Sequence, residues 1–396
     1  MRHARTAGTA GTARLLLAAL TAAALALLPA APARADGIRA RQWGNEAINA
    51  ERAWDTTRGE GVTVAVLDTG VDGTHPDLVG NVLPGRDLVG FGARRGDRAW
   101  ARHGTAMAGI IAGHGHGPGN GDGVVGVAPE ARILPVRVIL EGSDGARARA
   151  RQTRGGALAQ GIRWAADQGA DVINLSLGDD SESAHPEAAE DAAVQYALAK
   201  GAVVVASAGN GGEKGDRVSY PAAYPGVIAV TAVDRYGAPA PFSTSRWYAA
   251  VSAPGVDVVI ADPDRRYYEG WGTSAAAAFV SGAVALVRAA HPGLTPSQIR
   301  KLLVDTARDG PQEGRDDHKG YGTVDPAAAI EAGAALRPAD LKAAAAGYDR
   351  RYFGPGPRRD PEPGEPVGLL APVAGGAGVL LVATAAALWR GGRRTG

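Results

Sequence analysis

The stretch V-T-V-A-V-L-D at residues 62–68 is a near-continuous run of β-branched and apolar residues that ends in a carboxylate. Four later runs have the same character: R-I-L-P-V-R-V at 132–138, D-V-I-N-L-S-L at 171–177, A-V-V-V-A-S-A at 202–208 and V-I-A-V-T-A-V at 227–233. Strands of this kind are buried on both faces, which is typical of a parallel sheet covered by helices. We therefore expect these runs to form the central sheet of one large domain.

Ala-rich helical stretches alternate with the expected strands. They lie at residues 155–168, 188–200 and 296–306, and after His103 and Ser274. The helix at 296–306 has a complete start signal, because Thr295 can cap it, Pro296 suits the first turn and Gln298 completes a capping box. The alternation predicts an α/β fold, a three-layer sandwich with a mostly parallel central sheet and helices on both faces.

Composition narrows the class of protein and its partners. The 396 residues include 42 basic and 41 acidic side chains and no cysteine. Because the charges almost cancel, no nucleic-acid partner is expected. The lack of cysteine excludes disulfides, a thiol nucleophile and any cysteine-ligated metal site.

Residues 1–35 have the features of a secretory signal peptide. Arginines precede an apolar run at 15–28, and the small-residue stretch P-A-A-P-A-R-A ends at Ala35. A membrane anchor is the alternative, but the run is shorter than the ~20 residues that a span needs. We expect cleavage after Ala35. Residues 36–58 are then a short N-terminal arm, smaller than the ~40 residues at which domains begin to fold unaided, and we expect it to wrap the following domain.

Near the other end, residues 367–389 are uncharged throughout and have the length of a transmembrane helix. Trp389 suits the membrane interface, and the arginines that follow it favour the cytoplasmic side. A buried core helix is the alternative, but the Pro- and Gly-rich linker at 336–366 separates this segment from the domain at 59–335. We predict a single-pass protein of the cell membrane, with a cytoplasmic tail at 390–396 and an extracytoplasmic body.

Polar residues that follow buried strands mark the place for a functional site. In α/β sheets, ligands bind at the carboxyl ends of strands, and Asp68, Ser176 and Asn210 occupy such ends. His103 opens the run H-G-T-A-M-A-G-I-I-A-G, whose small residues let a helix start lie close to the sheet. Ser274, in G-W-G-T-S-A-A-A-A, opens an Ala-rich helix, where free N–H groups and the helix dipole favour developing negative charge.

These residue types fit nucleophilic catalysis by a serine. A serine hydroxyl needs a histidine to take its proton, and a carboxylate holds the imidazole in the right tautomer. We predict Ser274 as the nucleophile, His103 as the base and Asp68 as the partner of that base. The side-chain N–H of Asn210 would stabilise the oxyanion. The alternative is a set of unrelated polar residues in Gly-rich turns.

Four blocks resemble the subtilase family of serine peptidases. They are V-A-V-L-D-T-G-V-D-G-T-H-P-D-L around Asp68, H-G-T-A-M-A-G at His103, S-A-G-N at Asn210 and G-T-S-A around Ser274. Their order along the chain is that of the subtilisins. The resemblance implies a subtilisin-like fold and a serine endopeptidase of protein or peptide substrates. It also implies that the substrate backbone pairs with Ser176, Leu177 and Gly178, and that the first specificity pocket is walled by Ala208 and Gly209.

The sequence departs from the family pattern beside the predicted nucleophile. The family usually has Met after the serine and Pro three residues later, whereas this chain has Ala275 and Ala278. Neither residue transfers a proton, so the departure concerns the shape of the pocket and the helix start. The predicted triad is unaffected.

The order of segments, from signal peptide to terminal span, resembles that of the mycosins, actinobacterial peptidases associated with type VII secretion. This resemblance implies type VII secretion components as partners. It also leaves open a membrane-anchored scaffold of a secretion complex with little or no catalytic role. The intact set of Asp68, His103, Asn210 and Ser274 favours the enzyme.

Other histidines and carboxylates are interpreted as structural. His75 precedes a proline in the loop after the first strand. His114 and His116 have no third ligand in view, so we predict a solvated loop there. The cluster Asp179, Asp180 and Glu182 lacks the alternating pattern of a calcium loop. No metal or other cofactor is predicted, and a structural calcium ion, which some subtilases bind, is left open.

Overall fold

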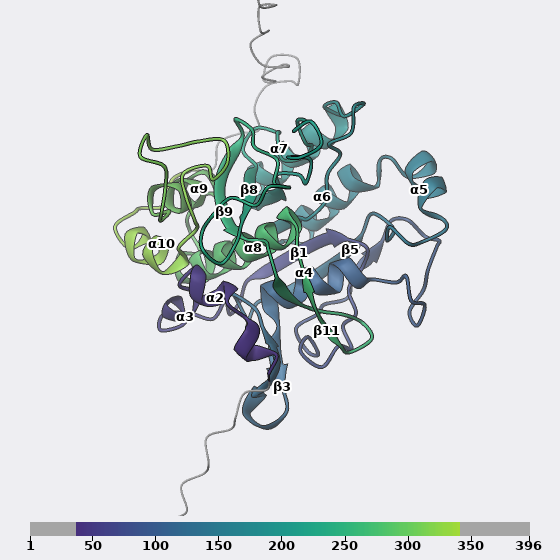
Figure 1. Ribbon diagram of the computed structural model, residues 1–396, viewed down its shortest axis with the longest axis horizontal. Coiled ribbons are helices and arrows are strands. Elements are labelled where there is room, and N and C mark those ends of the chain that lie inside the picture. The colour runs from purple at the N-terminus through teal and green to yellow at the C-terminus, as the bar shows by residue number, and fades with distance from the viewer. Residues whose placement is uncertain (1–36, 341–396) are drawn as a thin grey trace, which may run out of the picture. The chain divides into compact units, whose positions relative to one another are not determined.

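The computed structural model describes residues 37–340 (Figure 1). The predicted signal peptide at 1–35, the transmembrane helix at 367–389 and the tail at 390–396 lie outside the described residues. Within residues 37–340, one helix, α8 (Thr273–Ala290), is long and apolar enough to cross a membrane. Since 83% of that segment is buried inside the domain, α8 is a core helix.

The predicted α/β fold is confirmed by a seven-stranded parallel sheet. Its order is β2 (Arg86–Asp87), β5 (Arg132–Arg137), β1 (Thr63–Asp68), β6 (Val172–Leu175), β7 (Val203–Ser207), β8 (Ile228–Val233) and β9 (Ala249–Pro254). Five of these strands match the predicted runs. β2 and β9 were not predicted, because β2 has two residues and β9 is built mainly of small ones.

Helices cover both faces of the sheet (Figure 1). On one side lie α4 (Arg102–Ala112) and α8, which contact each other and the strands, with α9 (Pro296–Asp305) and α10 (Pro326–Gly333) beside α8. On the other side α6 (Ala157–Asp167) packs against α7 (Ala188–Ala199). Side chains of β1 pack against helices on both faces of the sheet. Val64 and Val66 belong to the core cluster around α8, whereas Leu67 lies next to Gly161 of α6. The predicted capping box of α9 is confirmed by both of its hydrogen bonds.

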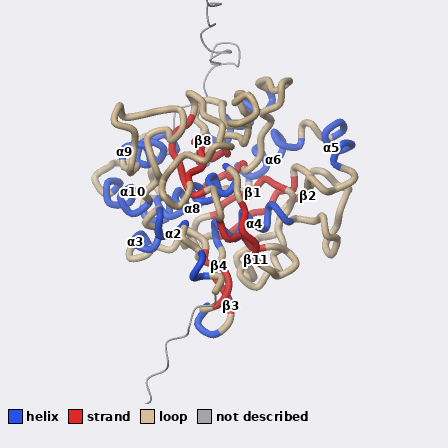
Figure 2. The backbone as a smooth tube through the Cα atoms, in the orientation of Figure 1, coloured by secondary structure: helices blue, strands red, loops and turns tan. Residues whose placement is uncertain are grey.

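Two antiparallel hairpins lie outside the main sheet. They are β3 (His114–His116) with β4 (Asp122–Val125), and β10 (Val258–Ala261) with β11 (Tyr267–Gly270). Figure 2 shows β3 and β4 as a separate pair below the main sheet. A short helix, α5 (Arg147–Thr153), follows β5. The prediction of a solvated loop at His114 and His116 was wrong, because both rings form hydrogen bonds within the structure.

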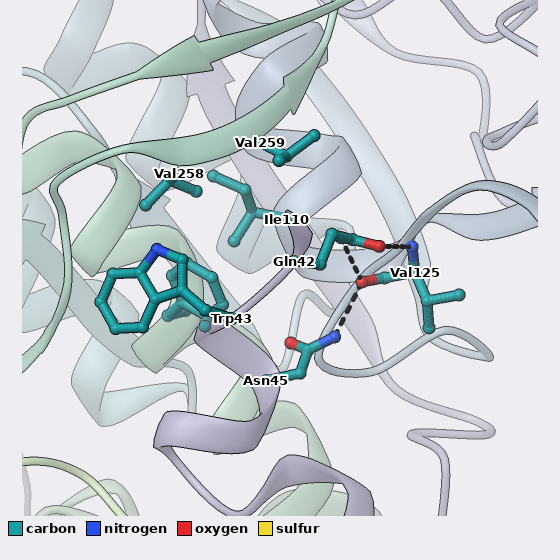
Figure 3. A pocket seen from close by; sticks show the side chains of 9 residues that line it. Gln42, Trp43, Asn45, Ile110, Val125, Val258 and Val259 are labelled. Atoms are coloured by element: carbon teal, nitrogen blue, oxygen red, sulfur yellow. Dashed lines mark hydrogen bonds between the residues drawn. The ribbon is translucent and has the colours of Figure 1, made fainter. Parts of the chain in front are cut away.

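The N-terminal arm packs along the domain through short helices. These are η1 (Arg39–Arg41), α2 (Gly44–Ala47) and α3 (Ala50–Ala53). The Gln42 amide donates to the Val125 carbonyl at 3.1 Å and accepts from the Val125 N–H at 3.0 Å, and Asn45 donates to the same carbonyl at 2.9 Å (Figure 3). Further along the arm, the Trp54 indole N–H donates to the Val127 carbonyl at 2.8 Å.

Candidate active site

Asp68 and His103 are in direct contact at the carboxyl end of β1. Asp68 is fully buried, and its two carboxylate oxygens lie 2.9 and 2.8 Å from Nδ1 of His103. His103 sits in the first turn of α4. The close approach depends on Gly104, because a side chain there would overlap the Gly70 carbonyl oxygen. The run of small residues after His103 therefore lets the helix start lie against the sheet, as its sequence predicts.

The environment of His103 favours its protonated form. Burial of the imidazole lowers its pKa, but the negative charge of Asp68, its hydrogen bond to the ring and the charge of Glu141 outweigh this effect, so the pKa of His103 is raised. Glu141 also accepts the His103 backbone N–H at 2.8 Å. With Nδ1 directed at Asp68, Nε2 is the nitrogen left to exchange a proton with a substrate or a nucleophile.

Ser274 lies in the first turn of α8 and is half-buried. Its hydroxyl donates to the Ser176 carbonyl at 3.2 Å, while the Ser176 hydroxyl donates to the Ser274 carbonyl at 2.8 Å. The serine also lines one pocket together with His103. The fold therefore places Ser274 and the histidine of the buried pair on the same pocket, and the Ser274 hydroxyl is hydrogen-bonded to the strand end at Ser176.

Asn210 is oriented by a residue that the sequence did not single out. The Thr273 backbone N–H and the Thr273 hydroxyl both donate to Oδ1 of Asn210, at 2.9 and 3.0 Å. These bonds engage the amide oxygen, and Asn210 is exposed and lines a pocket together with Ser274, so its two N–H groups can serve as donors to a group bound there. The signal for Thr273 was its place directly before the predicted nucleophile.

A pocket of about 450 Å³ lies on the Asn210 side of Ser274. Three of the predicted substrate-binding residues, Leu177, Gly178 and Gly209, line it. Ser176 is buried and does not line the pocket. Ala208 is fully buried, and its neighbours Ser207 and Gly209 line the pocket in its place.

The lining of this pocket includes a serine, Ser219, that the sequence did not single out. Ser219 is fully buried, and its hydroxyl has no hydrogen-bond partner among the described residues. A side chain on Gly178 would come within 2.6 Å of that hydroxyl, so Ser219 fills the space next to Gly178. Its sequence context, R-V-S-Y-P, contains no signal that predicts the position.

The other histidines have contacts of their own. His75 is fully buried, its Nδ1 lies 3.2 Å from the Asp77 N–H, and burial lowers its pKa. His116 lies 2.6 Å from the buried Asp77 carboxylate. Within residues 37–340, no group of three or more histidine, aspartate or glutamate side chains has the arrangement of a metal site.

Comparisons with known proteins agree with this architecture. A family model described as the subtilase family matches residues 59–322. Fervidolysin from Fervidobacterium pennivorans is 39% identical over 73% of this chain and 43% of its own length. Thermitase from Thermoactinomyces vulgaris is 39% identical over 68% of this chain and 88% of its own length.

Among solved structures, MycP1 from Mycobacterium smegmatis is similar with a TM-score of 0.63 and 33% identity, over 76% of this chain and 86% of MycP1. Another MycP1 structure, described as from the ESX-1 type VII secretion system, gives the same TM-score and identity. The chain thus spans less than half of fervidolysin and most of thermitase and MycP1.

Proposed function

The chain belongs to the subtilase family, and from this premise we propose that it is a serine endopeptidase that uses Asp68, His103 and Ser274. One observation carries the proposal. A fully buried carboxylate lies within 2.9 Å of a histidine ring that shares a pocket with a serine at the start of a helix. Acyl transfer by a serine needs this arrangement, in which a carboxylate orients a histidine base and the base activates the serine.

The proposed reaction is acyl transfer through a covalent intermediate. Nε2 of His103 takes the proton of Ser274 as the hydroxyl oxygen attacks the peptide carbonyl carbon. The oxyanion then accepts hydrogen bonds from the Asn210 side chain and the Ser274 backbone N–H. His103 passes its proton to the leaving amine, and water releases the acyl group by the reverse steps. Asp68 stabilises the imidazolium that forms between the two proton transfers.

The resting hydrogen bond of Ser274 fits this scheme. Its hydroxyl must leave the Ser176 carbonyl and turn toward His103 before it can react. In the proposed complex, the substrate backbone pairs with Ser176, Leu177 and Gly178. That pairing competes for the Ser176 carbonyl, so substrate binding favours release of the hydroxyl.

The proposal includes a location. The endopeptidase would be anchored by residues 367–389 with its catalytic domain outside the cell membrane, and it would act together with type VII secretion components. The charge pattern at the two ends of the sequence supports the topology. Likeness to MycP1, described as from a type VII secretion system, supports the association.

A fluorophosphonate probe, which labels activated serines, tests the activity. The full-length chain, Ser274→Ala and Ser183→Ala are incubated with the probe in detergent, the last as a control at an exposed serine that lines neither pocket. We expect labelling of the wild type and Ser183→Ala and none of Ser274→Ala. A folded wild type that takes no label would instead favour a membrane-anchored scaffold.

A further inference from the structure

A second pocket lies on the His103 side of Ser274. Its volume is about 250 Å³, and it lies between α4, the β10–β11 hairpin and the start of α8. Met107, Ile260, Trp271 and Ala275 contribute apolar surface to its lining. This pocket is separate from the one that contains Asn210 and Gly178.

The charged residues of this second pocket already have partners. Arg102 lies 2.6 Å from the Asp262 carboxylate, and Asp262 is almost fully buried. The Glu141 carboxylate accepts the His103 backbone N–H. A charged substrate side chain would have to compete with these contacts, whereas an apolar one would meet free apolar surface. The pocket therefore suits an apolar side chain.

Two residues give the pocket its size and shape. Ala275 directly follows Ser274 and is 4% exposed, so its methyl group leaves the pocket open where a longer side chain would fill it. Trp271 is 67% exposed, an unusual state for a large aromatic side chain, and its ring lies against Phe242 with centroids 4.8 Å apart. An indole held in this way offers a flat apolar surface beside the pocket.

The chemistry decides which half of the substrate meets this pocket. His103 gives its proton to the leaving amine, so the leaving half of the substrate lies on the histidine side of Ser274. The acyl half then lies toward Asn210, which holds the oxyanion. We propose that Ala275 opens a leaving-group subsite that, with Trp271, selects a large apolar side chain in the residue after the cleaved bond. This inference rests on the proposed endopeptidase function and specifies its substrates.

Acyl transfer to added amines measures this subsite directly. A short peptide p-nitroanilide acylates Ser274 and releases p-nitroaniline. The acyl-enzyme ester is then attacked either by water, which gives the peptide acid, or by an amino acid amide, which loses a proton to His103 and forms a new amide bond as Ser274 leaves. Glycinamide, leucinamide and phenylalaninamide are compared. The ratio of the two products depends on the leaving-group subsite and is independent of the rate of acylation.

For the full-length wild type, we expect leucinamide and phenylalaninamide to capture the acyl group about 10-fold or more better than glycinamide, the discrimination usual for an apolar pocket. Ala275→Met should bring the three amides close together, and the similarly small Ala275→Ser should keep the preference. Trp271→Ala, at an exposed position, should reduce capture of phenylalaninamide most. Thermal unfolding of each variant checks that the domain is folded.

The outcomes separate the two proposals. A wild type that releases p-nitroaniline but captures the three amides equally contradicts the subsite alone. The same holds if folded Ala275→Met and Trp271→Ala both keep the wild-type preference. A wild type that releases no p-nitroaniline contradicts the endopeptidase itself, and the subsite with it.

Discussion

Thr273 holds Asn210 through two hydrogen bonds to one atom, from its backbone N–H at 2.9 Å and from its hydroxyl at 3.0 Å. The hydroxyl also accepts the Gly209 backbone N–H at 3.3 Å. Thr273 thus links the backbone of Gly209, which lines the pocket, and the amide of Asn210 to the start of α8. The orientation of the proposed oxyanion donor depends on a neighbour of the nucleophile.

Thr273→Val keeps the shape of this side chain and removes its hydroxyl. We expect kcat to fall by about 10-fold, the effect of one hydrogen bond of about 1.4 kcal/mol, with little change in KM. Thr273→Ser should restore most of the rate. Steady-state kinetics on a peptide p-nitroanilide measure both variants. An unchanged kcat in Thr273→Val would show that the backbone bond alone orients Asn210.

Asn210→Ala removes the proposed oxyanion donor itself. We expect kcat to fall by about 10²–10³-fold, with labelling of Ser274 retained, because the nucleophile and base are left intact. The same kinetic assay, run beside fluorophosphonate labelling, measures the change. A rise in KM without a fall in kcat would place Asn210 in ground-state binding instead.

The raised pKa of His103 predicts the acid limit of activity. The base must be neutral to act, so kcat/KM should fall as pH drops through a pKa above the usual value of about 6.5. Asp68→Asn removes the charge that raises this pKa, so the acid limb should move to lower pH while the rate falls by about 10⁴-fold. The pH dependence of kcat/KM for both proteins provides the measurement. An acid limb that stays in place in Asp68→Asn would contradict the pairing.

Buried His75, whose pKa is shifted in the opposite direction to that of His103, predicts a pH dependence of stability. Burial lowers its pKa despite the nearby carboxylates of Asp77 and Asp72, so below about pH 6.5 the unfolded chain takes up a proton that the folded chain does not. The free energy of unfolding should therefore fall as pH drops from 7 through this range. In His75→Gln the slope should be smaller by up to about 1.4 kcal/mol per pH unit. Denaturant unfolding at several pH values tests this, and equal slopes would exclude His75 as the source.

The predicted anchor is tested by ending the chain at residue 366. We expect the full-length protein in the membrane fraction and the shortened one in the extracellular medium, because residues 367–389 are the predicted span. Fractionation followed by fluorophosphonate labelling reports both location and folding. Retention of the shortened chain in the membrane fraction would require another means of attachment.

The parts of the fold that depend on continuous runs of sequence were predictable. The five long strands are apolar on both faces, and the start of α9 has both halves of its capping box. β9 escaped prediction because its sequence, A-A-V-S-A-P, has low β propensity and is held by its pairing with β8. The order of strands in the sheet was beyond prediction, because it is set by tertiary pairing between segments far apart along the chain.

The active site divides in the same way. Asp68, His103, Asn210 and Ser274 could be named because each follows a strand or opens a helix. The roles of Ser219 and Trp271 could not, because they arise where separate segments meet. Ser219 lies behind Gly178, which comes about 40 residues earlier in the sequence, and Trp271 rests on Phe242. Contacts between segments far apart along the chain cannot be predicted from the spacing of residues in the sequence.

The N-terminal arm contacts the domain away from the two pockets beside Ser274. Residues 37–58 bind the domain through Val125, Val127 and other groups, and none of the arm residues lines the two pockets beside Ser274. The arm thus stabilises the domain through these hydrogen bonds and contributes no residue to either pocket. Proteolytic loss of residues 37–58 would therefore remove these contacts to the domain and leave the lining of both pockets unchanged.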